Sequence, residues 1–452
     1  MREPFKMTCR LLAAAAVATL LASPPERALA EQAPSDPVAE LRREIELLKA
    51  QVQELRQKLE SLAPTPASVP EPVAEVEPAP PAQPAPASAA PPSQSAGAFN
   101  PAISAVFQGI GNASVNHDRD DDGFSLSEAE IGLQAAVDPY ARVDLFLSFG
   151  AEGEAEVEEG FATLVALPGG LQLKGGRFKS AFGKWNTLHN HAFFTVDRPD
   201  VLTSFFGEES LTGDGGSLSW LIPGTGSVYL ESITEVSSTS NDVSFNAAGR
   251  DPLFLQHLGS VFTLTPNATL EAGATAAAGK AGASSHLVDA IDAAGLSGTL
   301  TPADNLSSNV FGADLTYKWK PLQRNLYRSF LWQGEILASR RRAERLDPGG
   351  FLERSTLRSF GGYSYAEYQF AKRLRGGLRY DATGLPDVED ARQRAISAVL
   401  RIQPTEFQEF RIQFRHTGRN ATAAEIFDDV ASDNEVFIEW IPVIGAHAAH
   451  KY

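Results

Sequence analysis

The sequence has a single cysteine among 452 residues, and no long apolar run follows residue 30. Cys9 lies in an N-terminal segment that we expect to be removed. The mature chain would then have no disulfide, no thiol nucleophile and no cysteine-bound metal. A stretch of 18 apolar residues is also lacking after residue 30, which excludes a transmembrane helix. Basic residues are in the minority, with 39 Lys and Arg against 56 Asp and Glu, so nucleic acid is not an expected partner.

Residues 1–30 have the pattern of a signal peptide. Basic residues precede an apolar stretch at 11–22, and Ala28-Leu29-Ala30 follows as an A-x-A cleavage site. The apolar stretch is too short to span a bilayer. Removal of this segment changes the net charge from −17 to −19, because it carries four basic and two acidic side chains. We therefore expect an exported, acidic protein.

Residues 36–62 predict a coiled coil that forms oligomers. Apolar residues alternate at spacings of three and four, and charged residues lie between them. Val and Ile at the first core position with Leu at the second favour a dimer in isolated peptides, although an attached oligomer can override this preference. The seam consists of Val38, Leu41, Ile45, Leu48, Val52, Leu55, Leu59 and Leu62.

Residues 63–98 predict an extended, disordered linker, because 11 of the 29 prolines lie there together with 11 alanines. From residue 100 to 452 the pattern changes to short segments in which apolar and polar residues alternate, as in Val143, Leu145, Leu147 and Phe149. A period of two with one apolar face is typical of β-strands. Sixteen strands are predicted, at 103–115, 124–137, 141–150, 156–167, 170–180, 215–222, 227–237, 254–264, 269–278, 308–319, 328–341, 355–370, 373–382, 391–402, 406–418 and 434–452.

The connections between these strands alternate between tight turns and longer polar loops. This alternation is typical of a transmembrane β-barrel of the outer membrane, with turns in the periplasm and loops outside. The predicted fold class is thus an all-β transmembrane barrel of about 16 antiparallel strands, preceded by a short α-helical coiled coil and the Pro/Ala-rich linker. An even strand count places both barrel ends on the periplasmic side. Pro442 interrupts the last strand and calls for a bulge or a lost hydrogen bond.

The segment 175–183, Gly-Gly-Arg-Phe-Lys-Ser-Ala-Phe-Gly, precedes a long loop that contains Asp197-Arg198-Pro199. This pattern resembles the phosphate-selective porin superfamily of Gram-negative outer membranes, and the resemblance extends over about residues 100–452. It implies a sixteen-stranded homotrimer whose third loop folds into the pore. The lysine ladder of the phosphate-binding members has no residue-by-residue match here, so phosphate specificity is not implied.

The loop 181–214 is the longest connection and is the expected constriction loop, folded inward so that its charges set a field across the pore. The alternative is an outward lid. His189 and His191 point the same way if extended, but no third ligand is identifiable, so no metal is predicted. The expected constriction residues are Lys184, His189, His191, Asp197, Arg198, Glu208 and Glu209.

The clearest functional signal is a row of arginines opposite the apolar face of three strands. Rings of Arg in a pore favour anions, although Glu335, Glu367, Glu409 and Glu439 on neighbouring strands would offset them in part. A register error of one residue would reverse this face. The predicted pore-lining and selectivity residues are Arg373, Arg375, Arg379, Arg401, Arg411 and Arg415.

Two further sequence motifs were considered, and neither predicts a metal site or a catalytic site. The acidic segment 118–123 resembles the start of a calcium loop but lacks the Glu at position twelve, and it reads as a solvated loop. A G-x-S-x-G elbow and a compact Ser/His/Asp set are both missing, so neither an enzyme nor a cofactor is predicted.

The sequence therefore predicts a porin-like channel for passive diffusion of small polar or anionic solutes, embedded in the lipid of the Gram-negative outer membrane. Its coiled coil would lie in the periplasm, and the chain would form a homo-oligomer, for which the resemblance favours a trimer. The alternative is a structural envelope protein, in which the barrel is an anchor and the coiled coil tethers peptidoglycan or another partner.

Overall fold

The computed structural model describes residues 101–114, 123–150, 153–223, 228–238, 241, 243–248, 251–324, 326–427 and 429–445. The chain divides into two units, Met1–Ser88 and Ala89–Tyr452, and the described residues belong to the second. The predicted signal peptide, the coiled coil at 36–62, the linker at 63–98 and the acidic loop at 118–122 lie outside the described residues and stay predictions.

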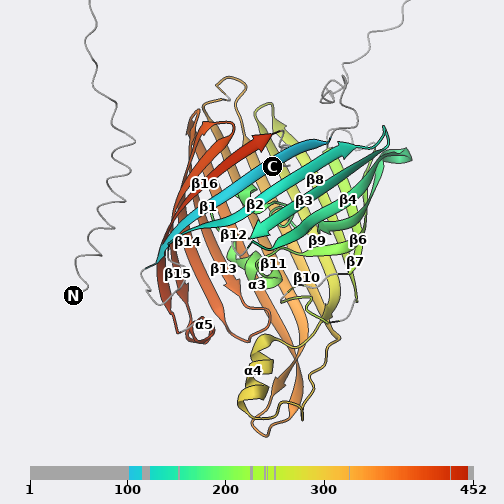
Figure 1. Ribbon diagram of the computed structural model, residues 1–452, viewed down its shortest axis with the longest axis vertical. Helices are drawn as coiled ribbons and strands as arrows, with labels where there is room; N and C mark the ends of the chain where they lie inside the picture. The colour runs from blue at the N-terminus through green and yellow to red at the C-terminus, as the bar shows by residue number, and fades with distance from the viewer. Residues whose placement is uncertain are drawn as a thin grey trace, which may run out of the picture. The chain divides into compact units, whose positions relative to one another are not determined.

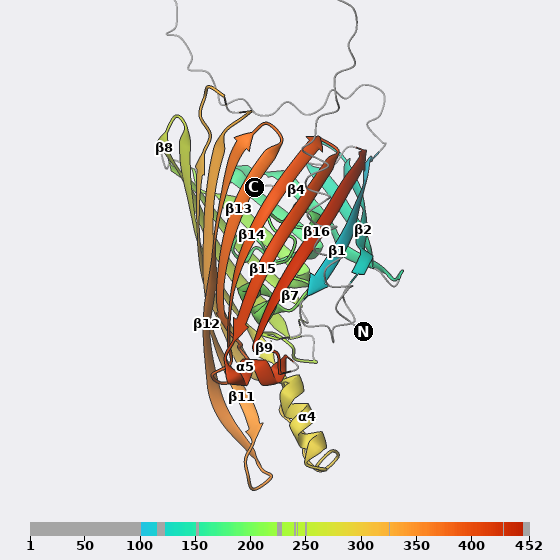
Figure 2. The same cartoon turned by 90° about the vertical axis from the view of Figure 1, so that its left-hand side faces the viewer.

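The described residues form a closed barrel of 16 antiparallel strands, in which each strand pairs with its sequence neighbours and β1 pairs with β16 (Figures 1 and 2). Closure matters because it leaves no strand edge with unpaired backbone groups. The strands are β1 (Ala102–Ser114), β2 (Gly123–Ala136), β3 (Ala141–Gly150), β4 (Ala155–Leu167), β5 (Leu171–Lys179), β6 (Thr212–Leu221), β7 (Val228–Ser238), β8 (Pro252–Thr265), β9 (Ala268–Ala281), β10 (Leu306–Trp319), β11 (Ser329–Leu346), β12 (Leu352–Ala371), β13 (Leu374–Gly384), β14 (Arg392–Thr405), β15 (Gln408–Arg419) and β16 (Ser432–Gly445).

Short helices occupy the connections. They are η1 (Pro168–Gly170), η2 (Asn190–Ala192), α3 (Asp200–Phe206), α4 (Ser285–Ala293) and α5 (Ala421–Ile426). No helix among the described residues is long and apolar enough to cross a membrane. Helix α4 lies beyond the same end of the barrel as the long β11–β12 hairpin (Figure 1).

The predicted fold class is confirmed, and the strand alternation explains it. In β14 the buried side chains alternate with exposed ones such as Ile396 and Leu400, so one face points to the interior and the other outward. The predicted alternation of connections also holds: the β8–β9 turn is short, whereas 180–211 and 282–305 are long. Strands β11 and β12 extend farther than predicted, to Leu346 and from Leu352.

Pro442 lies inside β16, where the sequence called for a bulge or a lost hydrogen bond. Pro442 pairs with Gln408 of β15. The register of β1 with β16 is continuous on either side but skips Phe107 and Gln108 on β1 and Ile441 and Pro442 on β16. Proline has no N–H to donate to the ladder, which accounts for this gap.

Candidate functional site

The loop 180–211, between β5 and β6, folds into the barrel and contains η2 and α3 (Figure 1). Its two ends meet at a narrow neck, where the Ser180 N–H donates to the Leu211 carbonyl at 2.8 Å. The Asn186 side chain donates to the carbonyls of both residues and accepts from the Leu211 N–H. Helix α3 ends at Phe206 and is capped by Gly207, whose φ of 85° is available to glycine at little cost. The loop is thus a closed unit inserted into the lumen.

An apolar cluster joins this loop to the inner wall on one side. Phe194 stacks on Tyr365 with ring centroids 5.4 Å apart, and Trp185 meets Tyr363 at 5.8 Å. The cluster is the main hydrophobic core of the described residues and lies inside the barrel. It contains Phe182, Trp185, Leu188, Ala192, Phe193, Phe194, Val201, Leu202, Phe205, Phe206 and Leu211 of the loop, together with Phe245, Leu253, Leu255, Ala277, Val310, Leu337, Tyr363, Tyr365 and Val399.

Wall glycines leave the space that these loop side chains fill. A Cβ at Gly312 would lie 2.7 Å from the Phe182 ring, and one at Gly361 would lie 2.8 Å from a methyl group of Val201. Real Cβ atoms do not approach other atoms this closely, so a larger residue at either position would displace the loop.

Glu335 of β11 holds the first turn of the loop. Its Oε1 accepts the backbone N–H groups of Lys184 and Trp185 at 3.0 and 3.1 Å, and the Tyr363 hydroxyl at 2.7 Å. Nearby, the ammonium of Lys184 lies 2.9 Å from a carboxylate oxygen of Glu271 on β9. Lys184 therefore pairs with a wall carboxylate.

Arginines of β13 and β15 hold the middle of the loop. The Asp197 carboxylate lies 2.6 Å from Arg379 Nη2 and 2.7 Å from Arg415 Nη1. Asp200 lies 2.5 Å from Arg415 Nη2, and Arg379 Nε is 2.6 Å from Asp381. Burial raises the pKa of Asp197, but the charges of Arg379 and Arg415 outweigh it and bring the pKa down to about 2. Asp197 is thus a permanent anion at neutral pH.

Arg411 of β15 connects the loop backbone to two wall carboxylates. Its Nη2 donates to the His191 carbonyl at 2.6 Å, and its other nitrogens lie 2.7 Å from Glu409 and 3.0 Å from Glu439. Arg401 of β14 lies 2.8 Å from the same Glu409 and 2.9 Å from Glu367. These ion pairs are buried. Each of the two guanidinium groups therefore has its charge balanced by carboxylates of the barrel wall.

Five of the six predicted pore-lining arginines lie on the inner face of their strands: Arg375, Arg379, Arg401, Arg411 and Arg415. Arg373 differs from the expectation, because β13 begins at Leu374 and Arg373 is an exposed turn residue. Arg375 is the least engaged of the five, with one guanidinium nitrogen 3.9 Å from Glu367 and a third of its side chain exposed.

The remaining predicted loop residues divide into buried and exposed groups. Arg198 is buried, donates to the Glu208 carbonyl at 3.0 Å and to the Ser210 hydroxyl, and lies over the Phe193 ring. The side chains of Glu208 and Glu209 are exposed. His189 and His191 are buried, with rings 5.7 Å apart, and face glutamates of β2 and β4.

Sequence reasoning found the arginines and the loop, but it missed the aromatic core of the loop and the loop carboxylates as arginine partners. The density of aromatics in 182–206, unusual for an exposed loop, was the available signal. The Asp197–Arg415 pair joins residues 218 positions apart, so local spacing held no sign of it.

A closed sixteen-stranded barrel with an apolar outer face, a charged inner face and a long loop in its lumen defines the class of outer-membrane, porin-type barrels. The anion-selective porin from Comamonas acidovorans has a TM-score of 0.50 at 10% identity, covering 76% of this chain and 99% of that chain. The outer membrane channel DcaP of Acinetobacter baumannii has a TM-score of 0.48 at 11% identity, covering 76% and 97%. The fold of this chain is that of outer-membrane porins.

At the level of sequence, no protein-family model matches. A protein of Aquifex aeolicus, described as an uncharacterized protein, is 28% identical over 371 residues, which are 77% of this chain and 74% of that protein.

Proposed function

We propose that this protein is an outer-membrane channel for passive diffusion of small polar solutes, with the loop 180–211 as its constriction. The observation that carries the proposal is the closed barrel whose charged inner wall holds that loop inside the lumen. The role is that of a channel, without a catalytic step. The test is a planar bilayer measurement on the purified full-length protein: discrete conductance steps support the channel, and a silent bilayer contradicts it.

We propose a preference for anionic solutes, and we assign it to fewer arginines than the sequence predicted. Four of the inward arginines are paired with carboxylates in the wall and the loop, so they add little net positive charge. Arg375 keeps much of its guanidinium exposed to the lumen. The anion-selective porin from Comamonas acidovorans shares the fold and is consistent with this preference.

Arg375→Gln is expected to shift the reversal potential in a salt gradient towards cations, because it removes a lumen charge without freeing a tightly paired carboxylate. The matched control is Arg373→Gln in the exposed turn, which is expected to leave the reversal potential unchanged. Equal shifts in both variants, or none in Arg375→Gln, would remove Arg375 from the selectivity filter.

Acid is expected to release the middle of the loop only below about pH 3. The pKa of Asp197 is lowered to about 2, so its ion pairs contribute fully above the ordinary pKa near 4 and are lost as the pH falls through about 2. The difference corresponds to roughly 2 kcal/mol. Conductance recorded between pH 5 and pH 2 measures this release. Asp197→Asn is the control, since its conductance should lack the component that titrates in this range.

The proposed location is the Gram-negative outer membrane, with a homotrimer joined in part by the coiled coil at 36–62 in the periplasm. Deletion of residues 36–62 is expected to leave an inserted, conducting barrel, because the linker at 63–98 uncouples the two parts. The oligomer should dissociate at a lower temperature in a heated gel-shift assay. An uninserted variant, or an oligomer of unchanged thermal stability, contradicts this division of roles.

A second candidate function is a structural anchor, with the coiled coil tethered to peptidoglycan or another envelope partner. The observation that favours it is the attachment of the loop to β2, β4, β11, β13 and β15, which fills the lumen with buried side chains. Conductance separates the two candidates, because a plugged anchor passes no ions in its native form.

A further inference from the structure

The loop 180–211 meets β2 and β4 at a group of acidic and imidazole side chains that neither the channel nor the anchor requires. Glu128 and Glu130 project from β2, and Glu158 and Glu159 project from β4. Adjacent strand residues normally point to opposite faces. Here the register of β3 with β4 shifts between Phe146 and Leu147, and this bulge turns both Glu158 and Glu159 towards the loop.

His189 lies at the centre of this group. Its Nδ1 is 2.7 Å from Glu130 Oε2 and 3.0 Å from Glu158 Oε2, and its Nε2 is 3.0 Å from Glu159 Oε2. His191 approaches the same Glu130 oxygen at 3.6 Å. One ligand atom each from Glu130, Glu158 and His189 lie within 4.8 Å of one another, a span that one metal ion can bridge.

Glu130 provides an independent sign that the group binds a ligand. Its side chain is 1% exposed, its Oε2 lies 2.7 Å from His189 Nδ1, and its Oε1 accepts no hydrogen bond from the described residues. A buried carboxylate oxygen without a donor is costly unless a cation satisfies it. Lys179 does not do so, because its ammonium lies 2.6 Å from Glu158 Oε1 and donates to the Leu188 carbonyl.

The balance of charges in this group also favours a bound cation. Four carboxylates share a buried space with one ammonium and two imidazoles. A mixed set of imidazole nitrogen and carboxylate oxygen is the donor set of Zn²⁺ and similar divalent transition metals. We propose that His189, Glu130 and Glu158 bind a divalent transition-metal ion, with His191 as the nearest further donor. The ion would join the loop to β2 and β4, in addition to the arginines that hold it on β13 and β15.

The test uses the purified full-length protein, treated with a chelator and titrated with ZnCl₂ alone in a calorimeter. One saturable site is expected. Glu130→Gln and His189→Ala should weaken the binding by more than about tenfold. The control is His257→Ala, which alters a buried histidine that bonds to Thr275, and it should bind zinc as the unaltered protein does. Heat-modifiability on gels shows that each variant has folded.

Absence of a saturable site, or binding unchanged in Glu130→Gln and His189→Ala, overturns the metal site. In the first case a protonated His189 and the Lys179 ammonium would balance the glutamates without a metal ion. The site does not depend on conduction, so a silent bilayer with zinc binding would contradict only the channel.

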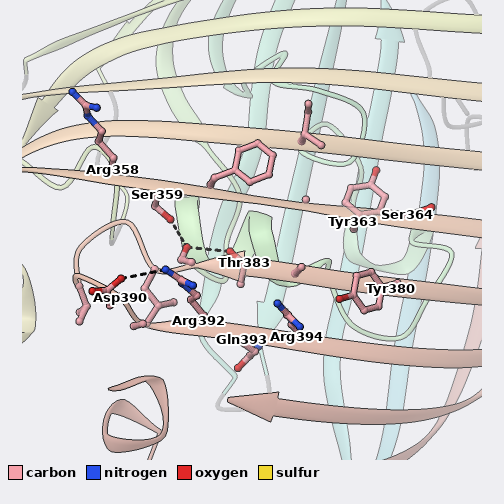
Figure 3. Close-up of a pocket in the computed structure, with 18 residues that line it drawn as sticks. Arg358, Ser359, Tyr363, Ser364, Tyr380, Thr383, Asp390, Arg392, Gln393 and Arg394 are labelled. Atoms are coloured by element: carbon pink, nitrogen blue, oxygen red, sulfur yellow. Dashed lines mark hydrogen bonds and ion pairs between the residues drawn. The ribbon is translucent and has the colours of Figure 1, made fainter. Parts of the chain in front are cut away.

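A second inference comes from the outer wall, where a hollow of about 580 Å³ lies over β12, β13 and β14 (Figure 3). Its floor is made of small residues, and Phe360 and Tyr380 border it as exposed aromatics. Arg358, Arg392 and Arg394 are exposed along it, and Arg392 pairs with Asp390.

The arginines at this hollow have few protein partners. Arg340 of β11 pairs in register with Arg358 of β12, and like charges in this position repel. Among the described residues, no ion pair reaches Arg340, Arg358 or Arg394. Exposed Ile336 and Ile396 lie farther along the strands, towards the apolar band of the barrel. An occupant with an anionic head and apolar chains matches both regions.

We infer that this groove binds a phosphorylated glycolipid of the outer leaflet, with its phosphate between the arginines and its acyl chains against Ile336 and Phe360. This placement rests on the proposed orientation, with the long loops outside. The test is native mass spectrometry of the detergent-purified protein with diphosphorylated lipid A as the probe. Retention should fall severalfold in the double variant Arg358→Gln/Arg394→Gln.

The matched control is Arg345→Gln/Arg354→Gln, which alters two exposed arginines that are paired with Glu389 and Glu344. Retention should be unchanged in it. Equal loss in both double variants means a general charge effect and overturns the site. Displacement of the lipid by inorganic phosphate alone shows that the groove recognises a free anion and overturns the lipid assignment. These outcomes are independent of conductance.

Discussion

Replacement of residues 184–208 by a short glycine–serine linker is expected to raise the single-channel conductance severalfold. The loop lies inside the barrel, held by Glu335 on β11, Arg379 on β13 and Arg415 on β15, so its removal widens the path for ions. The barrel should still form, because the strand pairing does not involve the loop. The neck makes a short linker sufficient, since Ser180 and Leu211 are hydrogen-bonded to each other.

The measurement is conductance in planar bilayers, with the unaltered protein alongside. The control replaces residues 285–300, which include α4 beyond the barrel end, and is expected to leave conductance near its original value. Conductance that stays the same in the loop variant would show that the constriction lies elsewhere. A silent native protein that conducts after replacement would favour the anchor as the native role.

The barrel was predictable because its strands follow a local rule. Period-two alternation depends on the residues of one strand, so segments such as 141–150 were found at their actual bounds. The ends of β11 and β12 were not, because their extension beyond the barrel wall carries polar residues that resemble a loop.

The interior of the site depends on long-range pairs, which local patterns do not contain. Phe194 and Tyr365 stack across 171 positions, and Lys184 meets Glu335 across 151. The arginine row was identified from strand parity, but its charge is offset by Asp197 and Asp200 of the loop. The inward position of Glu158 could not be predicted for another reason. Strict alternation along β4 would point Glu158 outward, but the bulge in β4 turns its side chain inward.

Arg411→Gln is expected to detach the loop 180–211 from β15. The attachment of the loop to the barrel wall should lose about 3–5 kcal/mol of stability. Arg411 is buried and supplies the donors for Glu439, Glu409 and the His191 carbonyl. Among the described residues, its loss leaves Glu439 with the Gln108 side chain as its one neutral side-chain donor, and a buried carboxylate without a cation is costly. Faster protease cleavage within 180–211 and a higher conductance would report the detachment.

The double variant Arg411→Gln/Glu439→Gln separates the charge from the shape of this site. Both residues then become neutral, so the penalty for an unpaired buried carboxylate disappears and part of the loop stability should return. The lost hydrogen bond to the His191 carbonyl should not return, so rescue is expected to be incomplete. Glu439→Gln alone is the third corner of the cycle. If the double variant is no more stable than Arg411→Gln, Arg411 acts through its hydrogen bond to the loop backbone, and the ion pair with Glu439 contributes little.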